Sequence, residues 1–265
     1  MAGIRKDFRS NRLAIFIICS IFFQFGHSTD ESEKNTDGQC IWYGVCRNYE
    51  DRGVDKSQYC SYNGTAKLLS EEGRQNLMTY CSYLDQGENN TFTCCDSEQI
   101  EIMNDNIERA EFILSDCPAC FHNFVQPICA MTCSPKQSQF LKVNQLDDKE
   151  SEYGPYVTSI DYAINHQYID ATFQSCKEVK FLLIMKSVNM MCGGAKDADC
   201  TSHKWYNFMG NYAINKYVPF QTNYITDPLN GYTSFNRSTV PCYKAVNESK
   251  GKCSCSDCSG SCAPN

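Results

Sequence analysis

Cysteine is the residue that most restricts what this chain of 265 residues can fold into, because it contains 19 of them. Four lie in the closing stretch, "GKCSCSDCSGSCAPN", where their spacing fits either a thiolate metal site or a set of disulfides. The compartment decides between the two, since disulfides persist in oxidising compartments. The other end of the chain therefore has to be considered first.

The N-terminus indicates export. Its first twelve residues carry four cations, and the apolar run "LAIFIICSIFFQF" follows from Leu13 to Phe25, before small or polar residues at Gly26 and Ser28. A basic head, an apolar stretch and a small-residue exit are typical of a secretory signal peptide. The run is shorter than the roughly 18 residues of a membrane-spanning helix. We predict that residues 1–28 are a signal peptide.

Removal of this leader takes away Cys19 and leaves 18 cysteines, an even number. An even count in an exported chain predicts a disulfide framework, here of about nine bridges. Zinc sites built from four cysteines usually consist of two separated C-x-x-C pairs, unlike the cysteine-dense tail. We therefore expect disulfides and no metal.

Glycosylation and charge agree with export. The sequence has four N-x-S/T acceptor triplets, which begin at Asn63, Asn89, Asn236 and Asn247. The net charge of −7 becomes −10 without the leader, since four cations and one aspartate are lost with it. Such an acidic balance disfavours a nucleic acid or an anionic membrane as partner, because both require a basic surface.

The mature chain is predicted to be one domain. Residues 29–39 are polar and charged, which indicates a disordered lead-in, and residues 40–265 contain no internal repeat and no long linker. From Asp96 to Leu114, apolar residues three and four apart predict a helix. Asp96 is its expected N-cap, and Gln99 is the reciprocal capping-box partner.

Three further helices and one strand are expected. The stretch "ACFHNFVQPICAMTC" has a helical apolar face, with Pro127 expected to kink the helix or end it. Apolar spacing also predicts helices over about 157–179 and 205–214, and a strand over 217–225 in which Pro219 favours an edge or a strand start. The fold class is therefore α+β, a helix-rich single domain with a small sheet and about nine disulfides.

Catalytic signals are absent from the sequence. His122, His166 and His203 are the three histidines outside the leader, and no G-x-S-x-G, H-E-x-x-H or phosphate-binding glycine loop occurs. A cysteine nucleophile needs a free thiolate, whereas all 18 cysteines are expected to pair. We predict a binding protein that is not an enzyme and has no cofactor.

Several stretches resemble one family. They are "CIWYGVC" (40–46), "TCCDSEQ" (93–99), "CPACFHNFVQPICAMTCSPKQSQFL" (117–141), "MCGGAKDADC" (191–200), "VPF" (218–220) and "CSCSDCSGSC" (253–262). All resemble the luminal N-terminal domain of the Niemann-Pick type C1 sterol transporter family. All 18 cysteines have a counterpart in order, so the resemblance covers roughly Cys40 to Pro264.

The resemblance implies a function. The family domain binds one cholesterol-like sterol in a deep pocket with the hydroxyl innermost, and receives it from the soluble Niemann-Pick type C2 carrier. We therefore expect sterol transport in the secretory pathway, in the lumen of the lysosome or late endosome or at an extracellular gut surface. The family is membrane-embedded, so this chain is expected to be the ectodomain of a longer protein, with a free-standing secreted form as the alternative.

The resemblance also implies site residues. Gln99 matches the buried glutamine expected at the sterol hydroxyl. Tyr59 stands where the family has a second polar anchor, an asparagine, and Val45 replaces an acidic neighbour. The hydroxyl partner at this end is then the Tyr59 phenol or Gln58, or the preferred sterol differs. Further pocket positions by match are Trp42, Ile102, Asn106, Ile128, Pro219 and Phe220.

Met190 and Met191 match the lid and the carrier-docking side of the pocket. The resemblance also implies the disulfide pairs Cys40–Cys94, Cys46–Cys60, Cys81–Cys129, Cys95–Cys133 and Cys117–Cys253. The remaining cysteines are expected to form the other bridges, with their pairing open; they are Cys120, Cys176, Cys192, Cys200, Cys242, Cys255, Cys258 and Cys262.

Two other classes of binding protein stay open. One is a folate- or riboflavin-type vitamin-binding module, in which planar heterocycles stack between tryptophans; this chain offers only Trp42 and Trp205. The other is a secreted structural or receptor-ligand module in which the apolar residues form only a core.

Overall fold

The computed structural model describes residues 38–182, 185–194, 199–227 and 231–262. These belong to one compact unit that runs from Asn35 to Asn265. The predicted signal peptide and residues 29–37 of the predicted lead-in lie outside the described residues. Within the described ranges, no helix is both long and apolar enough to cross a bilayer.

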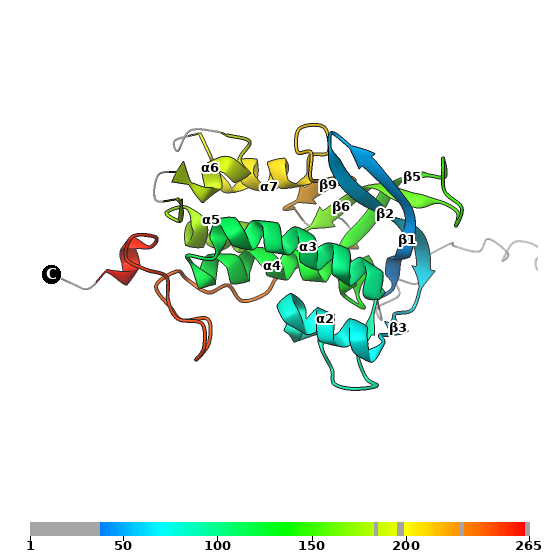
Figure 1. Cartoon of the computed structure of the whole chain (residues 1–265), viewed down its shortest axis with the longest axis horizontal. Coiled ribbons are helices and arrows are strands. Elements are labelled where there is room, and N and C mark those ends of the chain that lie inside the picture. The colour runs from blue at the N-terminus through cyan, green and yellow to red at the C-terminus, as the bar shows by residue number, and fades with distance from the viewer. Residues whose placement is uncertain (1–37, 183–184, 195–198, 228–230, 263–265) are drawn as a thin grey trace, which may run out of the picture. The chain divides into compact units, whose positions relative to one another are not determined.

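A long hairpin opens the fold (Figure 1). Strand β1 (Cys40–Asp51) pairs antiparallel with β2 (Val54–Gly64). Arg52 and Gly53, between the strands, have φ angles of 53° and 73°. Positive φ at both central residues is what a two-residue turn needs to match the twist of its strands. This local turn fixes the hairpin.

The hairpin joins a five-stranded mixed sheet centred on β6 (Tyr156–Ala163). β6 pairs antiparallel with β5 (Leu141–Asp147) and parallel with β9 (Gln221–Ile225), and it meets β2 at Cys60. The strand predicted over 217–225 is therefore shorter in the structure and covers only Gln221–Ile225. Pro219 lies just before it, where the missing proline N–H removes no hydrogen bond from the sheet.

The prediction of one helix over 157–179 is wrong. Residues up to Ala163 belong to β6, and helix α5 (His166–Cys176) begins only after Asn165. The Asn165 side chain accepts hydrogen bonds from the backbone N–H groups of Gln167 and Tyr168 and so caps α5. The apolar spacing across this region fits a helix, but the ladders to β5 and β9 outweigh the local pattern.

The predicted helix after Asp96 is confirmed as α3 (Ser97–Leu114). Asp96 Oδ1 accepts from the Gln99 N–H at 2.9 Å, and Gln99 Oε1 accepts from the Asp96 N–H at 3.2 Å, which completes the capping box. Helices α2 (Glu71–Cys81) and α4 (Pro118–Cys133) pack against α3, and α3 and α4 lie side by side in Figure 1.

Helix α4 does not end at Pro127 but continues to Cys133. Proline has no N–H, so the carbonyl of Asn123, four residues earlier, loses its helical donor. The Tyr168 hydroxyl donates to this carbonyl at 2.6 Å. A tertiary hydrogen bond from α5 thus replaces the missing helical one.

The predicted helix at 205–214 is α7 (Ser202–Gly210), and Ile214 beyond it is 60% exposed. Gly210 presses against β9, since a Cβ there would lie 2.1 Å from the Thr222 carbonyl oxygen. The smaller elements are β3 (Lys67–Leu68), β4 (Phe92–Thr93), β7 (Lys180–Phe181), β8 (Met185–Lys186), α6 (Ser187–Met191) and three 3₁₀ turns, Ser82–Leu84, Gln137–Gln139 and Ser259–Ser261.

Nine disulfides cross-link the described residues, and the α+β class is confirmed. The five pairs implied by the resemblance are among them. The other four are Cys120–Cys176, Cys192–Cys200, Cys242–Cys258 and Cys255–Cys262.

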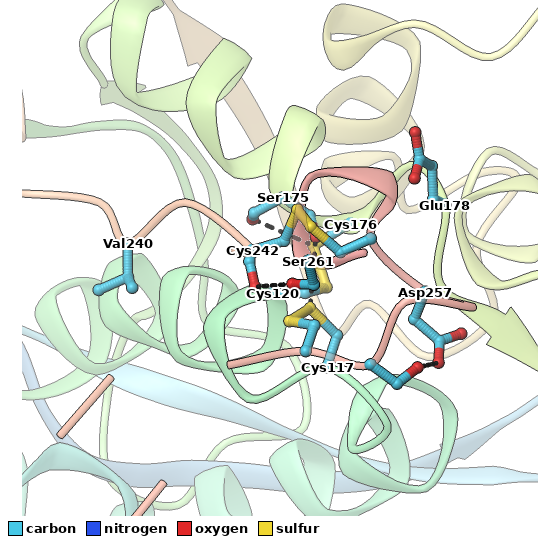
Figure 2. Close-up of a disulfide and its surroundings, with 12 residues drawn as sticks. Cys117, Cys120, Ser175, Cys176, Glu178, Val240, Cys242, Asp257 and Ser261 are labelled. Carbon is cyan, nitrogen blue, oxygen red and sulfur yellow. Dashed lines mark hydrogen bonds between the residues drawn. A yellow bond between two sulfur atoms is a disulfide. The ribbon is translucent and has the colours of Figure 1, made fainter. Parts of the chain in front are cut away.

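The C-terminal segment is attached to the beginning of α4 (Figure 2). Cys117, the N-cap residue of α4, bonds to Cys253 with a Cα–Cα distance of 4.4 Å. Six residues further along α4, the Asn123 amide both donates to and accepts from the backbone of Val240, at 2.9 Å each way. The tail is therefore held by covalent and polar contacts to a buried helix.

Candidate ligand-binding cavity

A cavity of about 560 Å³ lies between α3, α4, α7 and β9. Its walls are mainly apolar. The wall residues from the helices and the sheet include Met103, Ala110, Ile113, Phe124, Ile128, Met131, Met190, Met191, Tyr206, Phe208, Met209 and Tyr224. Such a volume and such a lining are typical of small-molecule sites, which occupy roughly 300–1,000 Å³.

The cavity has an exposed mouth and a buried inner end. Asn106 and Arg109 of α3 are exposed at the mouth, as are Ile214 and Tyr217 from the segment after α7. Among the residues of the inner end, Tyr59 and Phe220 are 6% and 3% exposed. The open side of the cavity therefore lies between α3 and the 214–217 segment, and its far end is at β2.

Disulfides brace the helices that form the walls. Cys81–Cys129 ties α2 to α4, and Cys95–Cys133 ties the residue before the α3 cap to the end of α4. Cys192–Cys200 follows directly on Met190 and Met191 of α6. Because empty apolar space is costly in a packed interior, cross-links that hold helices in place help to keep the cavity open.

Three aromatic rings close the inner end. Trp42 lies 5.3 Å from Tyr59 and 5.4 Å from Phe220 between ring centroids. Its indole N–H donates to the Thr132 carbonyl at 3.1 Å, and the side chain is fully buried. Trp42 therefore supports the wall from behind, and Tyr59 and Phe220 form its surface.

Tyr59 supplies a polar group to this apolar end. Burial, with a further contribution from Asp96, raises the pKa of its phenol far above the ordinary value, so the hydroxyl stays protonated. Tyr206 and Tyr224, on the adjoining walls, have pKa values raised by burial as well. Tyr59 can therefore donate a hydrogen bond at this buried end.

Gln99 is fully buried but is not among the lining residues. Its Oε1 accepts from the Gly44 N–H at 2.6 Å and also serves the capping box. Its Nε2 is buried without a hydrogen-bond partner in the described structure, a situation that costs roughly 1–3 kcal/mol. The Gln99 oxygen therefore caps the helix, while the Gln99 nitrogen keeps its N–H donors unused.

The β1–β2 ladder brings Gln99 and Tyr59 to the same end. Gly44, which Gln99 contacts, precedes Val45, and Val45 is the register partner of Tyr59. Met103, one helical turn after Gln99 on α3, lines the cavity. Gln99 thus lies immediately behind the inner end, on the side of the hairpin.

The remaining predicted residues divide into two groups. Ile128, Pro219 and Phe220 line the cavity together with Met190 and Met191. Asn106 lines only the mouth, where its amide donates to the Ile102 carbonyl of its own helix at 2.9 Å. Ile102 is half-buried and, like Trp42, does not line the cavity. Gln58 is buried and accepts from Arg47 at 3.2 Å.

Several wall residues were not predicted as ligand contacts. Met103 and Ala110 lie on the apolar face expected for α3, and Phe124 and Met131 on that expected for α4. Helical spacing identifies such faces but does not separate a packed core from a cavity wall. No pattern in the sequence indicates that Thr222 and Tyr224 line a cavity, because their position depends on the pairing of β9 with β6.

Other site chemistry is limited in the described part of the chain. No group of three or more His, Cys, Asp or Glu side chains there is arranged to hold a metal ion. The four predicted glycosylation residues, Asn63, Asn89, Asn236 and Asn247, are all exposed, as an attached glycan would require.

The fold and the cavity define a cysteine-rich α+β domain built around an apolar internal space. The family model described as Niemann-Pick C1 N terminus matches residues 37–265. The chain therefore belongs to the Niemann-Pick C1 N-terminal family.

Curated relatives agree with this family. The chain is 33% identical over 235 residues to "NPC intracellular cholesterol transporter 1" of Sus scrofa, which covers 85% of this chain and 18% of the relative. It is 30% identical over 232 residues to "NPC intracellular cholesterol transporter 1 homolog 1b" of Drosophila melanogaster, and 26% over 257 residues to the human "NPC1-like intracellular cholesterol transporter 1". The chain spans less than a fifth of the length of these relatives.

Proposed function

We propose that this domain binds one cholesterol-like sterol in the cavity and takes part in sterol transport, without covalent catalysis. The observation that carries the proposal is an apolar cavity of about 560 Å³ with a phenol at its buried end. The names of the curated relatives, which are cholesterol transporters, support the same ligand class.

The energetics suit a ligand that is almost entirely hydrocarbon. Burial of several hundred Å² of apolar surface at ~25 cal/mol per Å² supplies on the order of 10 kcal/mol. Loss of translational and rotational freedom removes a large part of this. The walls need no charged group for such a ligand, and the charged lining residues, Arg109 and Lys216, belong to exposed positions.

The single sterol hydroxyl needs a partner, because its burial without one costs roughly 1–3 kcal/mol. In the proposed pose the hydroxyl points inward, accepts from the Tyr59 phenol and approaches the unpaired Nε2 of Gln99. Tyr59 replaces the amide anchor that the family resemblance led us to expect, and it lines the cavity directly. The sterol tail then lies near the mouth, beside Ile214 and Tyr217.

The vitamin-binding alternative finds less support. A planar heterocycle would stack on tryptophan, but Trp42 and Trp205 are both fully buried and neither lines the cavity. A purely structural module does not account for an apolar cavity that is open at one end.

Delivery and location belong to the same proposal. We expect a Niemann-Pick type C2-like soluble carrier to hand over the sterol at the mouth, near Met190 and Met191. Nine disulfides suit an oxidising lumen or the outside of the cell. We further propose that the domain works as the ectodomain of a longer membrane-embedded protein, with the lysosome or late endosome and the gut surface as the candidate locations.

The proposal is tested with the purified oxidised chain and radiolabelled cholesterol, folate and riboflavin in parallel. Saturable binding of cholesterol alone is expected, with one sterol per chain. Saturable binding of folate or riboflavin without cholesterol would establish the alternative, and no binding of any of the three would refute a small-molecule role. Carrier hand-off is then measured as the rate of sterol transfer from the carrier to native protein and to Met191→Glu.

A further inference from the structure

The stretch between α7 and β9 forms one side of the cavity mouth. Residues 214–219 all line the cavity, on the side opposite α3. Two of them, Ile214 and Tyr217, are 60% and 53% exposed, so they lie at the open edge of the cavity. Residues 211–219 are called the mouth segment below. A ligand that passes through the open side of the cavity has to pass this segment.

The mouth segment is fixed at its two ends. Before it, Gly210 presses against the backbone of β9, since a Cβ there would lie 2.1 Å from a β9 carbonyl oxygen, and after it β9 joins the ladder with β6. Between these points the chain makes two turns. The Asn215 N–H donates to the Asn211 carbonyl at 2.9 Å, and the Val218 N–H donates to the Asn215 carbonyl at 3.2 Å. These bonds are local, so they fix the shape of the segment but not its position over the mouth.

The tip of the β1–β2 hairpin holds the segment in position. In Figure 1 the tip lies beside the loop that connects α7 to β9. Arg52, at the turn of the hairpin, donates to the Tyr212 carbonyl at 2.7 Å and to the Ala213 carbonyl at 3.1 Å. The Tyr49 hydroxyl donates to the Pro219 carbonyl at 2.8 Å. The hairpin therefore contacts the mouth segment near its beginning and at its end.

A buried lysine lies beneath the Arg52 contact. The Lys56 side chain is 1% exposed, and its Nζ lies 2.6 Å from Asp51 Oδ2. The same Nζ lies 4.6 Å from the centre of the Tyr212 ring, an arrangement in which the ring face attracts the cation. A buried charge is costly without a partner, but water can solvate this ammonium if Tyr212 moves away. The segment can therefore lift without leaving Lys56 unpaired in an apolar place.

The contact made by Arg52 is of a kind that opens easily. Its side chain is 37% exposed, so water can replace the two carbonyl acceptors when they separate. Exposed polar contacts of this kind contribute little to stability one by one. Ile214 and Tyr217 are already exposed, so lifting them uncovers little additional apolar surface. The closed position is thus held mainly by a few hydrogen bonds.

We propose that Arg52 is a positioning residue for the mouth segment, whose two hydrogen bonds hold the segment over the cavity and whose release lets a ligand enter or leave. The proposal rests on the proposed function, since it assumes that the cavity takes up a sterol. Arg52 does not line the cavity, so its contact stabilises the closed mouth equally with and without a ligand. Its loss therefore lowers the barrier to entry and to exit alike and leaves the affinity nearly unchanged.

The test compares Arg52→Gln with native protein, both as the full oxidised chain. Association and dissociation rates are measured with radiolabelled cholesterol, with phosphatidylcholine vesicles as sterol donor or acceptor. Both rates should rise on the order of fivefold in Arg52→Gln, while the dissociation constant stays within about twofold. Arg52→Lys should behave like Arg52→Gln, because an ammonium cannot reproduce the planar fork that reaches two carbonyls.

Arg74→Gln is the matched control. Arg74 of α2 also bridges two parts of the chain, through Glu71 and Asp85, and does not line the cavity. The rates of this variant should equal those of native protein.

Amide hydrogen exchange measured without sterol gives a second readout. The Asn215 and Val218 amides should exchange on the order of fivefold faster in Arg52→Gln than in native protein, and at the native rate in Arg74→Gln. Because this measurement uses no sterol, it separates the two proposals. If native protein fails to bind cholesterol, the sterol proposal fails, and the exchange rates still decide whether Arg52 holds the segment closed.

Unchanged exchange in Arg52→Gln would overturn the proposal. Sterol rates that stay the same while exchange accelerates would also overturn it, because the segment would then move without controlling the mouth. Faster dissociation with unchanged association would show that Arg52 supports the bound state instead of the closed mouth. Native-like rates in Arg52→Lys would assign the effect to charge and refute the role of the two hydrogen bonds.

Discussion

The hydroxyl of Tyr168 donates to the carbonyl oxygen of Asn123 at 2.6 Å, in the middle of the buried helix α4. The contact compensates for Pro127, which cannot donate to that carbonyl. It explains how α4 runs past a proline and still presents both Pro127 and Ile128 to the cavity.

Tyr168→Phe should therefore destabilise the domain by about 1–3 kcal/mol, since it leaves a buried carbonyl unpaired. In a Pro127→Ala background, the new N–H can satisfy Asn123, and the same substitution should cost clearly less. Denaturant unfolding of the four proteins of this cycle measures the difference. Equal costs in both backgrounds would contradict the compensation.

Tyr59→Phe and Gln99→Leu separate the two candidate partners of the sterol hydroxyl. Each variant is assayed with cholesterol and with its 3-deoxy analogue, which lacks the hydroxyl. Native protein should prefer cholesterol by roughly 1–3 kcal/mol, and loss of the true partner should remove most of this preference. If neither variant changes the preference, the hydroxyl does not lie at the inner end.

Gln99→Leu should in addition lower stability by about 1 kcal/mol, because it removes an acceptor from both the capping box and the Gly44 N–H. Tyr59→Phe retains the ring contacts with Trp42 and should change stability little. Thermal unfolding without sterol distinguishes this structural effect from the loss of binding.

Ile128→Trp should abolish sterol binding by filling the cavity from α4, while the fold persists. Ile128→Val is the matched control and removes one methylene, which is worth about 1 kcal/mol. Saturation binding and circular dichroism are measured on both. Retained affinity in the tryptophan variant would place the ligand elsewhere.

The Cys117–Cys253 bridge should be the most stabilising disulfide of the tail. It spans 136 residues, and chain entropy gives about 5 kcal/mol for such a loop as an upper bound, because other bridges shorten it. Cys255–Cys262, which spans 7 residues, gives about 2.5 kcal/mol. Paired Cys→Ser variants compared by thermal unfolding should show this order, and the reverse order would contradict it.

Stability should fall on acidification below the ordinary histidine pKa of 6.5, in part through His122. Burial, followed by the charges of Lys250 and Arg237, lowers the pKa of His122 in the folded protein. The unfolded chain then binds the proton first, so stability is full above about pH 6.5 and decreases as the pH falls toward the folded-state pKa. His122→Gln should flatten the change in Tm between about pH 7 and about pH 5; an unchanged slope would exclude this contribution.

The sequence alone predicted the features that depend on local spacing or on the number of cysteines. Asp96 and Gln99 were recognised as a capping box from spacing alone, and the cysteine count predicted the number of bridges. The resemblance, rather than the spacing, supplied five of the pairs and a minority of the cavity residues, among them Tyr59, Ile128 and Phe220.

Non-local contacts explain what was missed. Val157 to Ala163 has helical apolar spacing, yet it forms β6 because β5 and β9 flank it. The Asn123–Tyr168 bond that carries α4 past Pro127 joins two helices and leaves no local trace in the sequence. Helical spacing places Met103, and not its neighbour Ile102, on the apolar face of α3, but only the surrounding elements show that part of this face lines a cavity.

The bond from Cys117 to Cys253 has a consequence for biosynthesis. A chain that emerges from its N-terminus exposes Cys117 long before its partner, so this thiol must wait unpaired, or in a temporary pairing, while 136 more residues are made. This bond can therefore close only after translation has passed the tail, by oxidation of the waiting thiol or by disulfide exchange from a temporary pairing, and a chain truncated before Cys253 would leave Cys117 without its partner.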